Sequence, residues 1–164
     1  MFGERENVIC VRVDRTELSD SRWFTGSGIT RKVTLTVSDP VCTGEYGVFF
    51  TVTEASPEYA RVLTETEILN TTDAGQTVTV ISRLTDGDGV CALELSDTVQ
   101  VPAGESFTSR MNGILERPAL WSPDTPRLYT LSTWLRNADG ETRLSDAFPV
   151  GIRTSPSIRI MAFS

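Results

Sequence analysis

The chain has 164 residues, of which 39% are hydrophobic and 23% charged, and its formal net charge is −7. These values are typical of an ordinary globular protein with one domain, or one domain and part of another. The acidic balance, with Lys32 as the single lysine, argues against a basic groove for nucleic acid. Histidine is absent, which excludes a Ser-His-Asp or Cys-His catalytic site within the chain and any histidine-containing zinc site.

The three cysteines, Cys10, Cys42 and Cys91, are odd in number and far apart in the sequence. No close pair suggests a metal knuckle or a redox dithiol, so we expect buried free thiols, with one structural disulfide left open. The sequence contains no apolar run long enough for a membrane span, and its start lacks the basic-then-apolar plan of a signal peptide.

Two strands are expected before residue 38. Asn7–Asp14 and Thr30–Val37 both alternate apolar side chains in the manner of half-buried strands, and an irregular loop at 15–29 joins them. Two strands alone are marginal, so we expect them to be supported by the following domain, or by a neighbouring chain through exposed strand edges.

Strand patterns then recur at short spacing with turn signals between them, including Asp86-Gly87-Asp88-Gly89, a strong hairpin signal. The seven expected strands are Gly47–Glu54, Arg61–Asn70, Gln76–Thr85, Val90–Val101, Ser106–Leu115, Leu128–Arg136 and Glu141–Ile152. No stretch shows sustained helical periodicity. The pattern therefore predicts an all-β, antiparallel sandwich of the immunoglobulin-like kind with about seven strands.

The alternation also predicts which side chains face the core. The inward set comprises Val78, Val80, Ser82 and Leu84 on one strand, and Tyr129, Leu131, Thr133 and Leu135 on another. Trp134 falls on the face opposite Tyr129, so we expect it to be partly exposed.

Three segments carry a resemblance to a known family. The proline-dense corner Leu120-Trp121-Ser122-Pro123-Asp124-Thr125-Pro126, followed by Leu128-Tyr129, resembles the last strands of the immunoglobulin-like domain of family 2 glycoside hydrolases. Asp20–Ile29 is similar to a motif near the end of that family's N-terminal sugar-binding jelly roll. Val150–Thr154 is similar to the junction with its catalytic barrel. The family includes β-galactosidases, β-glucuronidases and β-mannosidases.

The resemblance implies a division of the chain into three parts. Residues 1–38 would be the last strands of a truncated sugar-binding jelly roll, and 39–154 would be the whole immunoglobulin-like sandwich. Residues 155–164 would be a tail or linker toward a catalytic barrel that the chain does not contain.

Catalysis by this family needs two carboxylates beside the scissile bond. The resemblance implies that both catalytic glutamates lie in the barrel, one of them after an asparagine, and this sequence contains no Asn-Glu pair. We therefore expect no catalytic residue, metal or cofactor in the chain. The resemblance places Asp20, Arg22 and Trp23 near the substrate in the parent enzyme. The alternative is that Trp23 and Phe24 fill the seam between two β domains.

Other motifs have simpler interpretations. Asp86 and Asp88 lack the further ligands of a calcium loop, so a hairpin turn is expected. Asn70-Thr71-Thr72 fits the glycosylation triplet, which matters only in a eukaryotic secretory route. The aromatic side chains Trp121, Tyr129 and Trp134 could stack on a sugar, although packing in the core or at a domain interface is the favoured interpretation.

The sequence predicts a non-catalytic structural domain of a family 2 glycoside hydrolase whose parent hydrolyses β-glycosides, with β-galactosides as the substrate. The alternatives are a freestanding carbohydrate-binding or adhesion module and a complete small glycosidase. The expected partners are the parent's barrel and sugar-binding domain, and a second copy through strand edges, but neither nucleic acid nor membrane. Bacterial cytoplasm, periplasm and secretion all remain open for the parent.

Overall fold

The computed structural model describes residues 8–14 and 28–153. Its contacts divide the chain into two units, Met1–Val37 and Ser38–Ser164. In the first unit, the described residues 8–14 and 28–37 carry no strand, contrary to the two strands expected there. A strand is held by hydrogen bonds to a neighbouring strand, and the apolar side chains of these segments stay exposed, with Leu35 at 87%. Alternation alone therefore does not make a strand.

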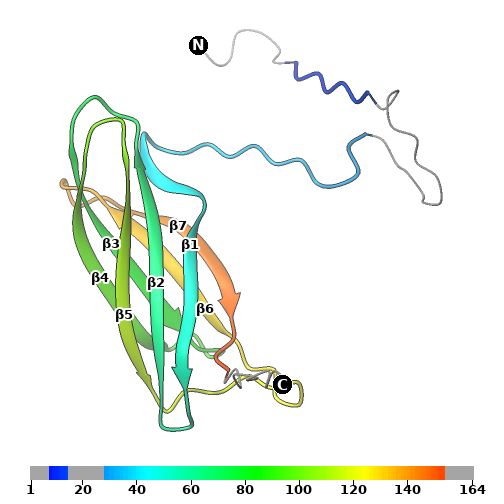
Figure 1. Ribbon diagram of the computed structural model, residues 1–164, viewed down its shortest axis with the longest axis vertical. Helices are drawn as coiled ribbons and strands as arrows, with labels where there is room; N and C mark the ends of the chain where they lie inside the picture. The colour runs from blue at the N-terminus through cyan, green and yellow to red at the C-terminus, as the bar shows by residue number, and fades with distance from the viewer. Residues whose placement is uncertain (1–7, 15–27, 154–164) are drawn as a thin grey trace, which may run out of the picture. The chain divides into compact units, whose positions relative to one another are not determined.

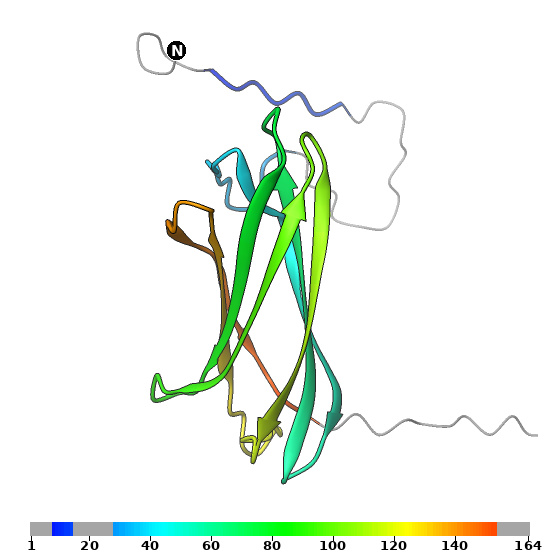
Figure 2. The ribbon, with the colours of Figure 1, turned by 90° about the vertical axis from the view of Figure 1, so that its left-hand side faces the viewer.

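The described residues of the second unit, 38–153, form seven strands, and every pair of neighbours is antiparallel. The strands are β1 (Val41–Ala55), β2 (Tyr59–Asn70), β3 (Gln76–Thr85), β4 (Cys91–Val101), β5 (Ser106–Glu116), β6 (Tyr129–Arg136) and β7 (Thr142–Val150). They form a three-stranded sheet in the order β1-β2-β5 and a four-stranded sheet in the order β4-β3-β6-β7. The two sheets lie as separate layers (Figures 1 and 2). The predicted all-β immunoglobulin-like sandwich is confirmed.

The first strand of the sandwich begins at Val41, six residues before the predicted start at Gly47. A β-bulge lies between Thr43 and Val48, and within it Tyr46 has a positive φ of 54°. A Cβ added at Gly47 would lie 2.9 Å from the backbone carbonyl oxygen of Gly44, so the bulge leaves no room for a side chain there. The glycines that look like a loop in the sequence therefore let the strand continue through the bulge.

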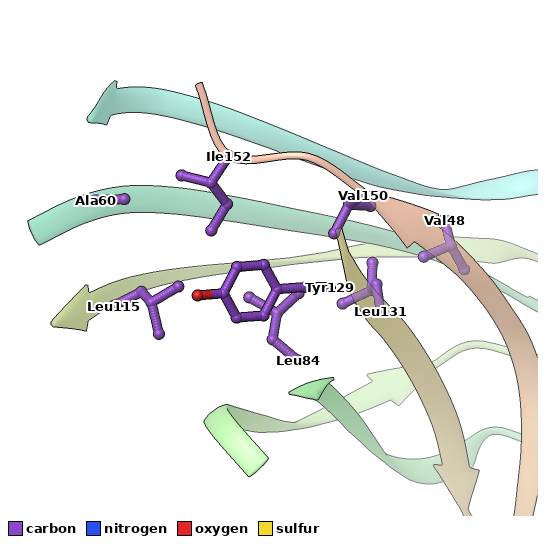
Figure 3. Packing of buried hydrophobic residues seen from close by; sticks show 8 residues of the cluster. All are labelled: Val48, Ala60, Leu84, Leu115, Tyr129, Leu131, Val150 and Ile152. Atoms are coloured by element: carbon purple, nitrogen blue, oxygen red, sulfur yellow. The ribbon is translucent and has the colours of Figure 1, made fainter. Parts of the chain in front are cut away.

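Two hydrophobic clusters fill the space between the sheets. The first, drawn in Figure 3, consists of Val48, Ala60, Leu84, Leu115, Tyr129, Leu131, Val150 and Ile152. The second consists of Ile68, Val78, Val80, Val99, Val101, Met111 and Leu135. All of the side chains predicted to face inward on β3 and β6 are buried. The clusters contain side chains from all seven strands, so burial of apolar surface joins both sheets.

Buried hydroxyl groups lie between the two clusters. On β3, Ser82 separates Val80 from Leu84, and on β6, Thr133 separates Leu131 from Leu135. The two hydroxyl oxygens of Ser82 and Thr133 lie 3.4 Å apart. The core is therefore apolar at both ends of the sandwich and hydroxyl-rich in the middle.

The cysteines differ in part from expectation. All three are free thiols, but Cys10 and Cys91 are exposed and Cys42 is only partly buried. Cys91 is the first residue of β4, beside the tip of a hairpin, and the first two residues of this strand are exposed. The expectation of buried thiols was therefore wrong for Cys10 and Cys91.

Candidate functional site

The predicted site residues Asp20, Arg22 and Trp23 lie outside the residues that the structure describes, as does Phe24. Their proximity to a substrate therefore stays a prediction.

The most closely connected group of ionisable side chains is at the hairpin between β1 and β2. The Tyr59 hydroxyl donates a hydrogen bond to Glu54 Oε1 at 2.5 Å, and Arg61 Nε donates to Glu54 Oε2 at 3.0 Å. The Arg61 guanidinium also lies over the Tyr59 ring, 5.6 Å from its centre. Register explains this cluster, because Glu54 and Arg61 are paired across the hairpin on its outer face.

These contacts shift the pKa values of Glu54 and Tyr59 in opposite directions. The hydrogen bond from Tyr59 lowers the pKa of Glu54, aided by Arg61, and the same bond raises the pKa of Tyr59. A general acid in glycoside hydrolysis needs a carboxyl group whose pKa is raised. Glu54 is therefore suited to keep its charge and hold the hairpin, and not to protonate a leaving group.

Other carboxylates of the sandwich also have structural partners. Glu65 pairs with Arg110 across β2 and β5, and the Oε1–Nε distance is 2.6 Å. Glu94 pairs in the same way with Arg83 across β3 and β4. In both cases the acid faces a cation on the neighbouring strand, which is the pattern of sheet stabilisation and not of two acids flanking a bond.

Two hollows in the described surface are open and shallow. One of about 450 Å³ is lined by Glu58, Tyr59, Arg61, Ile114, Glu116 and Arg117 at one end of the β1-β2-β5 sheet. Another of about 240 Å³ is lined by Trp121, Leu128, Gly151 and Arg153. Ligand sites bury most of their ligand, which neither of these hollows would do.

The sugar-stacking interpretation of the aromatic side chains is not supported. Tyr129 is buried in the core, and the Arg83 guanidinium lies over the Trp134 ring, 5.1 Å from its centre. The Trp121 side chain packs against Gly151, where an added Cβ would lie 3.3 Å from its Cβ and Cγ, and Arg153 lies over the ring. An arginine of the same chain therefore lies over one face of each tryptophan ring, where a sugar would stack.

The turn at Asp86 is a hairpin connection, as predicted. Its carboxylate oxygen Oδ1 accepts hydrogen bonds from the backbone N–H groups of Asp88 and Val90, at 3.0 and 2.8 Å. Gly89 has a positive φ of 81°, which its lack of a Cβ permits. Within the described ranges, no group of three metal-ligating side chains is found.

Asn70, the first residue of the glycosylation triplet, is 1% exposed. Its Nδ2 donates hydrogen bonds to the carbonyl oxygens of Ala74, Val101 and Pro102 at 2.8 to 3.1 Å. Its Oδ1 accepts from both the backbone and the hydroxyl of Thr72. A glycan on this nitrogen is incompatible with the folded structure, and Asn70 instead joins the β2–β3 loop to the β4–β5 loop.

Sequence reasoning missed the cluster at Glu54 and the loop-joining role of Asn70. The signal for the first was present, because a strand ending in Glu54 and another starting near Arg61 form a hairpin that places both side chains on one face. The role of Asn70 could not be predicted without knowing which loops meet in the fold.

No helix among residues 8–14 and 28–153 has the length and hydropathy required to cross a membrane.

Comparison with known proteins gives a consistent result. The model of the glycosyl hydrolases family 2 matches residues 47–153. The chain is 36% identical over 152 residues to the β-galactosidase BoGH2A of Bacteroides ovatus, covering 92% of this chain and 18% of that protein. It is 25% identical to a β-glucuronidase of Formosa agariphila, covering 93% of this chain and 17% of the relative.

The fold is also similar to solved structures. A β-glycosidase from Bacteroides vulgatus matches with a TM-score of 0.61 and 29% identity, covering 80% of this chain and 16% of that one. The chain thus spans less than a fifth of the length of each of these three relatives.

Proposed function

Because the chain belongs to glycosyl hydrolase family 2, we propose that it is a non-catalytic accessory domain of a longer enzyme that hydrolyses β-glycosides. The observation that carries this proposal is that Glu54, Glu65 and Glu94 each pair with an arginine on the neighbouring strand, an arrangement that serves the sheet and not a scissile bond. The catalytic carboxylates would then be supplied by another part of the parent enzyme.

We propose β-galactosides as the parent's substrate. This is supported by the match to a β-galactosidase, which is 36% identical over 92% of the chain. The match to a β-glucuronidase at 25% identity makes β-glucuronides the second candidate.

The domain would act as a rigid spacer between its neighbours. The chain enters the sandwich at Val41, which pairs with Asn70, and leaves it after Val150, which pairs with Tyr129. These pairs lie at opposite ends of the sandwich (Figure 1), and the 12 residues of β2 span roughly 40 Å at about 3.3 Å per residue. A preceding and a following domain would therefore be held apart by that length.

The proposed domain boundaries follow from the same scheme. Residues 1–38 would end the preceding sugar-binding domain, with Asp20, Arg22 and Trp23 close to the parent's substrate, and 155–164 would lead toward the barrel. Supporting this, the β-galactosidase match covers 152 residues and so extends beyond residues 47–153, which the family model matches. Partners would be the barrel and sugar-binding domain of the same chain.

The reading frame on either side of this segment tests the proposal. We expect it to encode a preceding jelly roll and a following barrel with two catalytic glutamates. A frame encoding only these 164 residues would contradict the proposal.

The alternative of a freestanding sugar-binding module is tested by calorimetry of the 164-residue chain with galactosides, glucuronides and mannosides. We expect no saturable heat at millimolar sugar, because the ring faces of Trp121 and Trp134 are occupied by arginine side chains. Saturable binding that is lost in the Trp134→Ala variant would favour the module instead.

A further inference from the structure

The outer face of the β1-β2-β5 sheet carries an oblique apolar stripe. Phe49 on β1 is 59% exposed and Ile114 on β5 is 52% exposed, while Leu63 on β2 lies between them and is partly buried. Phe49 pairs with Glu65 of β2, which comes two residues after Leu63. Ile114 pairs with Arg61 of β2, which comes two residues before Leu63. Such diagonal neighbours on one face are within reach of large side chains. We call these three side chains the stripe.

Ion pairs border the stripe on both sides. On one side Arg61 binds Glu54 at 3.0 Å, and on the other Arg110 binds Glu65 at 2.6 Å. These four side chains sum to zero charge, although the chain as a whole carries −7. An apolar centre with a polar border is the usual anatomy of a protein interface. Two acidic copies can approach each other here without bringing net like charge together.

We propose that this face binds a second copy of the chain, with a two-fold axis running along the stripe. Such an axis places each apolar residue of the stripe against its own counterpart. It also exchanges the two sides, so that Glu54 of one copy faces Arg110 of the partner, and Arg110 of the first faces Glu54 of the partner. In a two-fold interface each contact occurs twice.

The remaining positions fit the same axis. One row across the sheet consists of Thr51 on β1, Leu63 on β2 and Asn112 on β5. Rotation about the stripe brings Arg61 against Asn112 and Glu65 against Thr51, which are pairs that can form hydrogen bonds.

Other two-fold axes in the plane of the sheet fit less well. An axis along the strands brings Arg61 against Arg61 and Glu65 against Glu65. An axis across the strands brings Ile114 against Arg110 and Phe49 against Glu54. An axis along the other diagonal brings Glu54 against Glu54. Like charges and buried unpaired charges are both unfavourable in an interface. Charge complementarity therefore selects the axis along the stripe.

The contact is small, because three apolar side chains and their polar border are less than the area that stable interfaces bury. We therefore expect a reversible dimer with a dissociation constant on the order of 0.1 mM. Sedimentation velocity of the 164-residue chain over a concentration series from about 10 µM to 1 mM is expected to show a monomer converting to a dimer. A monomer throughout this series would overturn the proposal.

A matched pair of variants tests which sheet is used. Leu63→Arg places a charge in the centre of the stripe and is expected to abolish the dimer. Leu144→Arg is the control, because Leu144 is 58% exposed on β7 of the other sheet. It is expected to leave the dimer unchanged, and an equal effect of both substitutions would contradict the assignment to β1-β2-β5. Near-UV circular dichroism confirms that each variant is folded.

Charge exchange tests the axis itself. Glu54→Arg places two Arg–Arg contacts in the homodimer, and Arg110→Glu places two Glu–Glu contacts there, so each variant alone is expected to be monomeric. In an equimolar mixture both contacts become Arg–Glu pairs, and a one-to-one heterodimer that weakens with salt is expected. A mixture that stays monomeric, or a single variant that dimerises like the unmodified chain, would overturn the proposed axis.

Discussion

The hydroxyl oxygen of Tyr129 accepts a hydrogen bond from the backbone N–H of Ala119 at 2.8 Å. Tyr129 begins β6 and its ring lies within the first hydrophobic cluster, where Figure 3 shows the hydroxyl at the end of the cluster near Leu115. Ala119 lies in the proline-rich connection that crosses from β5 to β6. One side chain therefore fixes the crossing segment to the core, in the manner of the tyrosine corner of immunoglobulin-like sandwiches.

Removal of that hydroxyl is expected to destabilise the sandwich. Tyr129→Phe keeps the ring but leaves the Ala119 N–H without its acceptor, which costs about 1–2 kcal/mol. Urea unfolding followed by tryptophan fluorescence measures the loss. Tyr46→Phe is the control, because Tyr46 is 83% exposed and its substitution should change the free energy of unfolding by less than about 0.5 kcal/mol. Equal effects of the two substitutions would refute the role of the Tyr129 bond.

Asn70 should tolerate little change. Asn70→Asp keeps the shape but replaces a donor of three hydrogen bonds by an acceptor facing three carbonyl oxygens. We expect a loss of about 3 kcal/mol or more in the free energy of unfolding at pH 7. The exposed Asn112→Asp is the matched control and should be near neutral. A stable Asn70→Asp protein would show that the loops are held together by other contacts.

Gly113 on β5 permits the close approach of β4. A Cβ built at this position lies 2.8 Å from Leu93 Cδ2 and 3.1 Å from both methyl groups of Leu95. Gly113→Val is therefore expected to cost about 1–3 kcal/mol through overpacking. Thr108→Val on the outward face of the same strand should be neutral, because it only increases β-propensity. Thermal unfolding of both variants distinguishes overpacking from a general effect on β5.

The Glu54–Tyr59 bond has a measurable effect on titration. Its loss in Tyr59→Phe should raise the pKa of Glu54, and Glu54→Gln should lower the pKa of Tyr59. Since the folded-state pKa of Glu54 lies below the ordinary value of 4.5, its stabilising contribution is present above that pH and is lost as pH falls through the folded pKa. Carbon-detected NMR titration measures both groups. An unchanged Glu54 midpoint in Tyr59→Phe would mean that the hydrogen bond does not form in solution.

Much of the sandwich could be predicted from alternation and turn residues. The ends of β3 and the turn at Asp86 agree with the prediction, because a period of two and a Gly-containing turn are local signals. The early start of β1 was missed, since whether Gly44 and Gly47 sit in a loop or a bulge depends on how this segment pairs with β2. Strands before residue 38 were expected from the same alternation but are not formed by the described residues.

The candidate site was less predictable than the fold. The occupied ring faces of Trp121 and Trp134 depend on Arg153 and Arg83, which come from other segments of the chain. Similarly, the burial of Asn70 depends on the carbonyl oxygens of Val101 and Pro102, about 30 residues away. Partners distant in the sequence decide both features, and a pattern within one strand carries no information about them.

The most direct test of the account is a turnover assay of the purified 164-residue chain with nitrophenyl β-galactoside and nitrophenyl β-glucuronide. If the catalytic carboxylates belong to another part of the parent enzyme, release of nitrophenol will equal that of buffer at every substrate concentration. Saturable turnover that persists through purification and disappears on substitution of a single Asp or Glu of this chain would contradict the account.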